Sequence, residues 1–350
     1  MSAADRTPLA EFDYELPEQA IAQVPIEPRT AARLLDALDP AAPPVDRRVA
    51  DLPALLCKGD VLVVNESRVL PARLELHKTT GGHVEVLLLA PVGGDPAGPG
   101  ALWEALVRPA RRVREGTVLS AGSHPVVEII GRAEDEEATD AGVHLVRLID
   151  VETAAACGTV PLPPYIHEAL GDPERYQTVY ARSPGSVAAP TAGLHFTDDL
   201  LDRCQSAGAT VERIDLAVGL GTFRPITAEV VEDHVMHAER YRVPETTLGA
   251  CREARRVIAV GTTALRALET VAAGAPLEGE TRLFVHGSYE WRIVDVLLTN
   301  FHLPRSSLLV LLAAFAGPRW RGLYSHALRR GYRFLSFGDA MILGRRMGAS

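Results

Sequence analysis

Residues 180–197 combine a histidine with a backbone whose course is restricted by proline and glycine. The two prolines fix their own φ, and the two glycines accept backbone angles that other residues resist. The segment follows neither the helical nor the strand period, and Thr197 stands directly before a predicted helix that it can cap. A rigid loop that presents His195 and backbone amides at a helix N-terminus is a candidate anion or nucleotide site. The alternative is a tight surface loop, where turn residues also collect.

A strand followed by a helix carries a second group of polar residues. Val257–Val260 predicts a buried strand, and Thr262, Thr263 and Arg266 fall at the start of the helix that follows Gly261. In such units, ligands bind at the carboxyl end of the strand. The hydroxyls and free amides could bind a carboxylate or a ribose. Alternatively, the threonines could cap the helix beside a surface arginine.

Asp295, Thr299, Asn300 and His302 accompany another apolar strand. Thr299 and Asn300 could hydrogen-bond a nucleobase edge or a ribose, and His302 titrates near neutrality and could move protons. The alternative is a satisfied core histidine beside a turn asparagine.

Two further stretches give weaker signals. Arg68 and Arg73 follow the wholly apolar strand Val61–Val64 and could clamp a phosphate or a carboxylate, or could face solvent. Gly219 and Gly221 form a Gly-x-Gly pair that lacks the third glycine of a dinucleotide fingerprint, so alone they are typical of a turn.

His234 and His237 are three residues apart and would share one face of a helix. A metal-dependent hydrolase built on this pair is one alternative function, although the spacing identifies no third ligand. The four cysteines form no Cys-x-x-Cys pair, which indicates neither a zinc knuckle nor a redox dithiol.

Charge is distributed unevenly along the 350 residues. The net charge of −9 argues against nonspecific nucleic-acid binding, but residues 305–350 hold eight arginines and one acid, which makes them +7 and leaves −16 for residues 1–304. A second cluster holds four arginines in residues 108–114. Arginine suits phosphate, although solvated basic surfaces would look the same. The candidate phosphate contacts are Arg108, Arg111, Arg112, Arg114, Arg329 and Arg330.

The pattern of elements predicts an α/β domain interrupted by an all-β domain. Residues 1–73 and 151–350 alternate helix and strand, whereas residues 74–150 contain short strands separated by glycine- and proline-bearing turns, typical of a small barrel or Greek key. The acidic run at 134–137 is expected to be an exposed loop. The expected strands of the insertion are 74–77, 83–89, 102–107, 126–130 and 143–148.

We expect a cytoplasmic protein without a membrane segment. The first eight residues lack the apolar core of a secretory signal. The apolar run Leu308–Ala316 is shorter than the roughly 20 residues that span a bilayer, and it predicts a buried helix or strand instead.

Six stretches, taken together, resemble the S-adenosylmethionine:tRNA ribosyltransferase-isomerase family of queuosine biosynthesis. In chain order they are NESRVLPAR at 65–73, GSVAAPTAGLHFT at 185–197, VGLGTFRP at 218–225, EDHVMH at 232–237, GTTALR at 261–266 and DVLLTNFHLP at 295–304. The ending at 332–341 also fits, so the resemblance covers nearly the whole chain.

The resemblance implies a fold, a reaction and a set of partners. The fold would be a distorted α/β barrel with an inserted all-β domain. S-adenosylmethionine would donate its ribosyl group to 7-aminomethyl-7-deazaguanine at the tRNA wobble position, and the rearranged product would carry an epoxycyclopentane while adenine and methionine leave. The partner would be the anticodon arm of a tRNA, with no metal, and we expect a monomer. The wobble base would have to leave its stack to reach the enzyme.

The resemblance also implies site residues. His195, Asp295 and His302 are the candidates for proton transfer. We expect S-adenosylmethionine to bind through residues 188–196 and the start of the 262–266 helix, and Gly193→Val to block binding with the fold intact. The candidate substrate-binding residues are Asn65, Arg68, Arg73, Pro190, Thr191, Gly193, Leu194, Phe196, Gly219, Gly221, Thr222, Phe223, Thr262, Thr263, Arg266, Thr299 and Asn300.

Three positions depart from the family pattern. Ala217 stands where members commonly carry histidine, His286-Gly287-Ser288 where they carry Tyr-Pro-Gly, and Glu66 where aspartate is usual. Replacing imidazole by methyl removes both a donor and an acceptor. An alternative function is therefore a divergent member that binds S-adenosylmethionine but has another acceptor or no turnover.

Overall fold

The computed structural model describes residues 6–93, 98, 100–132, 142–219 and 226–345. The chain divides into two compact units. The first comprises residues 1–67, 163–183 and 189–350, and the second comprises residues 68–162 and 184–188. The chain crosses between the units after residues 67, 162, 183 and 188. The first and third crossings fall in β4 (Ser67–Val69) and β11 (Ser183–Ser186), which pair as a two-stranded sheet.

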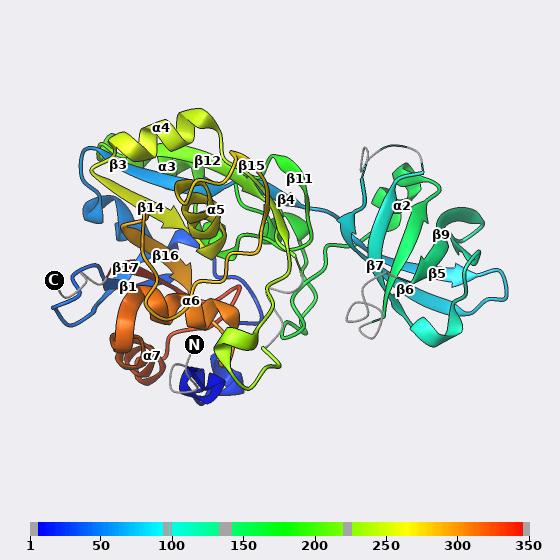
Figure 1. Cartoon of the computed structure of the whole chain (residues 1–350), viewed down its shortest axis with the longest axis horizontal. Coiled ribbons are helices and arrows are strands. Elements are labelled where there is room, and N and C mark those ends of the chain that lie inside the picture. The colour runs from blue at the N-terminus through cyan, green and yellow to red at the C-terminus, as the bar shows by residue number, and fades with distance from the viewer. Residues whose placement is uncertain (1–5, 94–97, 99, 133–141, 220–225, 346–350) are drawn as a thin grey trace. The chain divides into compact units, whose positions relative to one another are not determined.

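A nine-stranded mixed sheet forms the centre of the first unit (Figure 1). Its four central strands, in the order β12, β3, β14 and β16, run parallel to one another, so their carboxyl ends meet at one edge. In sheet order, the strands are β15 (Glu278–Thr281), β13 (Glu239–Arg242), β12 (Thr210–Leu216), β3 (Asp60–Asn65), β14 (Arg256–Val260), β16 (Val296–Asn300), β17 (Ala340–Gly344), β1 (Arg33–Ala37) and β2 (Val45–Arg48).

Helices cover both faces of this sheet, which explains why its central strands are almost wholly apolar. All six residues of β3 are buried, as are the last four of β14. Alternate residues such as Leu62 and Val64 share one core with α3 (Asp198–Ser206) and with the 3-10 helix η5 (Val49–Leu55). The other helices of the unit are α4 (Glu245–Glu253), α5 (Thr262–Ala272), α6 (Ser307–Ala316) and α7 (Trp320–Arg329).

Glycine makes the turn from β14 into α5 possible. Gly261 has a φ of +93°, a conformation that side-chain-bearing residues rarely adopt, and it is the N-cap of α5. The predicted strand–glycine–helix unit at 257–266 is confirmed. Thr197 caps α3 as expected, because its hydroxyl accepts the Leu200 amide hydrogen.

The second unit contains a closed six-stranded antiparallel barrel, the α-helix α2 (Val151–Cys157) and the 3-10 helix η6 (Ala110–Arg112). In barrel order, the strands are β10 (Val143–Leu148), β7 (Leu102–Arg108), β6 (His83–Pro91), β5 (Arg73–Lys78), β8 (Val118–Ala121) and β9 (His124–Arg132).

All five strands expected in the insertion are present, and β8 is an additional one. The sequence does not signal β8 because its four residues bury only Leu119 and show no apolar alternation. The acidic run at 134–137 lies outside the described residues.

The expected mixed α/β architecture is confirmed in this coarse form, and the structure also contains a closed six-stranded barrel. The larger sheet has two edge strands among the described residues, β15 and β2, so the expected closure into a distorted α/β barrel is not seen in its hydrogen bonding. The domain boundaries at 73/74 and 150/151 stay a prediction. In the described part of the chain, no helix is both long and apolar enough to cross a membrane, and the predicted apolar run forms the buried helix α6.

A buried ion pair holds the amino ends of β3 and β14. Asp60 is fully buried, and its carboxylate accepts from the Arg256 Nε at 2.9 Å and from the Cys57 amide at 2.7 Å. We expect Asp60→Ala to lower the free energy of unfolding by about 3 kcal/mol, because the remaining groups lose a buried partner. Arg242→Ala, which removes an exposed pair with Glu278, is the matched control and should change it by less than about 0.5 kcal/mol. Urea denaturation of both variants checks this, and equal losses would contradict it.

Candidate active site

Asn65 ties three elements together at the carboxyl edge of the sheet. Its side chain accepts from the Leu216 amide at 3.0 Å and donates to the Leu216 carbonyl at 2.9 Å, which links the ends of β3 and β12. The same amide group lies 3.4 Å from the Thr263 hydroxyl at the start of α5. Asn65 is fully buried, so these bonds satisfy it internally and fix the relative positions of the three elements.

The end of β16 meets the glycine-bearing loop that stands out in the sequence. This loop forms the 3-10 helix η8 (Thr191–His195). The Thr191 hydroxyl donates to the Asn300 Oδ1 at 2.9 Å, and the Asn300 Nδ2 lies 3.4 Å from the His195 Nε2. Because the Asn300 amide nitrogen is a donor, the His195 Nε2 is the acceptor of this bond.

His195 is a neutral imidazole at physiological pH. It is 5% exposed, and burial, together with the nearby positive charges of Arg29, Arg175 and Arg333, lowers its pKa to about 4. Such a group binds through hydrogen bonds and is a weak base.

Thr299 and His302 lie on the other face of the sheet from Asn300. Val296 and Leu298 belong to the core that contains η8, so alternation places Asn300 on that face and Thr299 opposite. The His302 Nε2 lies 3.1 Å from the Thr299 hydroxyl, and burial lowers the His302 pKa to about 3. The structure therefore does not bring His302 to His195, and His302 matches the alternative of a satisfied core histidine.

Asp295 is at the wrong end of β16 for the predicted role. It precedes the strand, whereas Asn300 ends it, which separates the two by about 16 Å along the strand. Its carboxylate accepts the Val257 amide hydrogen at 3.0 Å and pairs with Arg345 at 3.6 Å. These contacts hold the amino ends of β14 and β16.

Arg266 is linked to the backbone of Gly219 through the carboxylate of Glu239. It forms a buried ion pair with Glu239, whose Oε1 accepts the Gly219 amide hydrogen at 3.3 Å. The Arg266 Nη2 is buried and has no hydrogen-bond partner among the described residues. Gly221, Thr222 and Phe223 lie outside the described residues.

The space beside Gly193 is occupied by the protein itself. A Cβ at this position would lie 2.0 Å from the Tyr180 hydroxyl and 2.8 Å from the Thr178 methyl group. Leu194 and Phe196 are also buried, and the Phe196 ring packs edge-on against Tyr180. The expectation that Gly193→Val leaves the fold intact is therefore wrong, because the added methyl groups would meet the core.

Sequence reasoning missed a carboxylate on β12. Asp215 is partly buried near the carboxyl end of that strand, and burial and the nearby Glu66 carboxylate raise its pKa to about 6 against the opposing charges of Arg240 and Arg242. Glu66 itself pairs with Arg213 at 3.6 Å. An isolated aspartate within a strand gives no local signal, because its neighbours become visible only after the strands pair.

The other predicted residues are distributed as follows. Pro190 is the N-cap of η8, and Thr262 is buried in the first turn of α5. In the second unit, Arg73 pairs with Glu85 at 3.9 Å, and Arg68 is half-buried in β4. The six arginines chosen for tRNA are all exposed. They belong to both units, and their role as phosphate contacts stays a prediction.

His234 and His237 do not share a helix. The 3-10 helix η10 (Val231–Asp233) ends before them, and the His234 ring packs against Phe284. Across the part of the chain that the structure describes, no three histidine, cysteine or acidic side chains are grouped to hold a metal ion. The geometry expected for the metal-dependent alternative is therefore wrong.

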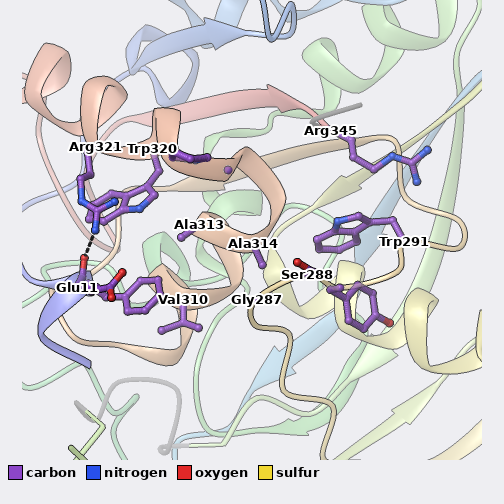
Figure 2. Close-up of a pocket in the computed structure, with 14 residues that line it drawn as sticks. Glu11, Gly287, Ser288, Trp291, Val310, Ala313, Ala314, Trp320, Arg321 and Arg345 are labelled. Atoms are coloured by element: carbon purple, nitrogen blue, oxygen red, sulfur yellow. Dashed lines mark hydrogen bonds between the residues drawn. The ribbon is translucent and has the colours of Figure 1, made fainter. Parts of the chain in front are cut away.

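A separate cavity of about 700 Å³ lies beside α6, away from these residues. Figure 2 shows Trp320 and Arg321 on one side of it and Trp291 and Arg345 on the other. Arg345 is the partner of Asp295, so the cavity extends toward the amino end of β16 and none of the predicted site residues lines it.

The fold and the buried polar edge are typical of α/β enzymes, in which ligands bind where parallel strands end. The chain belongs to the family described as queuosine biosynthesis proteins, whose sequence model matches residues 9–343.

Named relatives cover almost the whole chain. It is 50% identical to the S-adenosylmethionine:tRNA ribosyltransferase-isomerase of Rubrobacter xylanophilus over 95% of this chain and 96% of that protein. It is 46% identical to the protein of the same name from Solibacter usitatus over 96% and 99%. The crystal structure of S-adenosylmethionine tRNA ribosyltransferase from Thermotoga maritima is similar, with a TM-score of 0.52, 34% identity, and coverage of 95% and 99%.

The close approach of the Tyr180 hydroxyl to Gly193 predicts that a side chain at this position lowers the stability of the fold, whatever its effect on binding. Gly193→Ala should lower the free energy of unfolding by about 1–3 kcal/mol, because its Cβ must displace the Tyr180 hydroxyl. Gly219→Ala is the control, since a Cβ there meets no described residue within 4 Å. Chemical denaturation of both variants measures the difference. A fully stable Gly193→Ala protein would show that η8 can shift freely.

Proposed function

We propose that the chain transfers the ribosyl group of S-adenosylmethionine to 7-aminomethyl-7-deazaguanine at the tRNA wobble position and isomerises it to the epoxycyclopentane of epoxyqueuosine. Adenine and methionine are the other products. The observation that carries this proposal is the full-length match, at 46–50% identity, to relatives named for this reaction. The buried polar edge supports it, since the blocks that carry the resemblance supply Asn65, Thr191, His195, Thr263 and Asn300 to one end of the sheet.

The polar edge suits recognition of a nucleoside. Thr191, Asn300 and His195 form one chain of hydrogen bonds, and a neutral His195 adds no positive charge beside a sulfonium substrate. We assign these three groups to binding and orienting S-adenosylmethionine. The sulfonium supplies the reactivity, and the protein positions it.

We assign proton removal to Asp215 in place of Asp295. A general base works best when its pKa lies near the working pH, and the Asp215 pKa of about 6 meets this condition at the carboxyl edge. Asp215 lies near the end of β12, two residues before Ala217. A carboxylate therefore stands beside the position where this chain lacks the family's histidine.

Turnover is tested directly by following adenine. Incubation with S-adenosylmethionine and a tRNA that carries 7-aminomethyl-7-deazaguanine should release adenine and methionine and add the rearranged ribosyl group to the tRNA, as chromatography and nucleoside mass spectrometry would show. Unmodified tRNA is the control, because it lacks the attacking amine. Binding of S-adenosylmethionine without adenine release would identify a binding protein instead.

The pH dependence of single turnover separates the candidate bases. The rate should fall as the pH drops below about 6, because protonation removes the Asp215 base. Glu66→Gln removes a like charge, so it should lower the Asp215 pKa and move this fall to lower pH. Asp215→Asn should lose the rate while S-adenosylmethionine still binds.

His195→Gln serves as the matched control for this profile. The His195 pKa of about 4 lies below the fall, so the variant should turn over more slowly without moving it. A profile that shifts in His195→Gln and is unchanged in Glu66→Gln would assign the base to His195.

A further inference from the structure

A second pocket, of about 450 Å³, gathers four arginines at the β1–β2 end of the large sheet. Arg33, Arg47, Arg48 and Arg333 all line it. The strand directions place it at the same edge as the candidate active site. Because β17 runs antiparallel to β16, its first residue pairs with Asn300, the last residue of β16.

One buried carboxylate fixes the backbones of two of these arginines. Asp339 accepts the Arg33 amide hydrogen at 2.7 Å through one oxygen and the Arg333 amide hydrogen at 2.8 Å through the other. Asp339 is 2% exposed, so this bridge is sheltered from water. It holds together two arginines that are 300 residues apart in the sequence.

Two of the arginines face each other across paired strands. In the antiparallel pairing of β1 with β2, Arg33 lies directly opposite Arg48. Like charges in this position destabilise a sheet. An anion bound between them would remove that cost.

The acidic residues of the pocket are already engaged. Asp46 accepts from Tyr332 at 2.7 Å, from Arg330 at 3.0 Å and from His326 at 3.0 Å, and Asp51 accepts the Arg48 amide hydrogen. The arginines spend few of their donors on the protein. Arg48 gives one to the Ala31 carbonyl, and Arg47 gives one to Asp36. Arg33 gives one to the Arg330 carbonyl, and Arg333 gives one to the Val24 carbonyl. The Arg33 guanidinium also stacks on the Tyr332 ring and lies 4.0 Å from the Asp46 carboxylate. Each guanidinium has five, so donors remain for a ligand.

The pocket adjoins the candidate active site. Arg333 lines the pocket and is also one of the charges that lower the His195 pKa. The Asn300 side chain reaches the Asp339 carbonyl at 3.5 Å. A nucleotide held beside His195 and Asn300 therefore has a positively charged pocket next to it.

We propose that this pocket binds a backbone phosphate of the tRNA beside the modified nucleotide. The inference rests on the proposed function, which brings the wobble nucleotide to this edge. A tRNA nucleotide that enters the candidate active site brings its flanking phosphates close to this pocket. Planar guanidinium groups bind phosphate oxygens in pairs. This assigns the nearest phosphate contacts to Arg33, Arg47, Arg48 and Arg333, which the arginine clusters of the sequence only partly indicate.

The test is the salt dependence of tRNA binding to Arg47→Ala/Arg48→Ala. The slope of log affinity against log salt concentration should fall in magnitude by about 0.7–0.9 for each phosphate that the variant no longer neutralises, with weaker binding at physiological salt. S-adenosylmethionine affinity, measured by calorimetry, should be unchanged. Arg47→Lys/Arg48→Lys should retain most of the slope, because it retains the charge.

The matched control is Arg252→Ala/Arg255→Ala. These arginines are exposed in the same unit, and Arg255 precedes β14 at the amino edge of the sheet, so the net charge changes equally at the opposite edge. The control should keep the wild-type slope. If the double alanine variant melts far below the wild type, the slope is measured on the single variant Arg48→Ala instead. The Arg48 side chain is exposed, so its removal should leave the fold intact.

Several outcomes would overturn the proposal. They are an unchanged slope in the alanine variants, an equal reduction in the control, and weaker S-adenosylmethionine binding with an intact slope, which would place a small-molecule carboxylate in the pocket. Thermal stabilisation of the wild type by inorganic phosphate, without a slope change, would assign the pocket to free phosphate. The slope can be measured with unmodified tRNA, so a wild type that releases no adenine would count against the proposed function alone.

Discussion

The hydrogen bonds of the buried Asn65 are the constraint on which the candidate site depends. They join the ends of β3 and β12 to the start of α5. The positions of these three elements in turn set where the other polar groups of the carboxyl edge lie. Because an unsatisfied amide is costly in a buried position, this arrangement leaves little freedom. Gly261 then turns the chain out of β14, and Asn300 completes the row from β16.

Positive charge organises the same edge. Burial, together with the positive charges of Arg29, Arg175 and Arg333, lowers the pKa of His195 and keeps it neutral. Asp339 holds the backbones of Arg33 and Arg333 side by side. On the β12 side, burial and the nearby Glu66 carboxylate raise the pKa of Asp215. The edge therefore changes in character along its length, from a carboxylate base, through neutral hydrogen-bonding groups, to arginines. This order suits a substrate with a sulfonium at one end and a nucleic-acid backbone at the other.

The sequence predicts local features of this arrangement well. Apolar runs located β3, β14 and most barrel strands, and turn and cap residues located the start of α5 and of α3. The sequence does not show which end of a strand a residue occupies, nor which residues far along the chain it contacts. Predictions that depend on either of these failed. Asp295 and Asn300 are close in the sequence, yet they lie at opposite ends of β16 and therefore at opposite edges of the sheet. Arg33 and Asp339 meet across 306 positions without any local signal.

A crystal structure with S-adenosylmethionine and an anticodon stem-loop tests the central claim most directly. The account predicts the adenosyl group beside Asn300 and His195, with the sulfonium-bearing carbon toward Asp215 and an RNA phosphate among Arg33, Arg48 and Arg333. S-adenosylmethionine bound instead in the cavity between Trp291 and Trp320 (Figure 2) would contradict it.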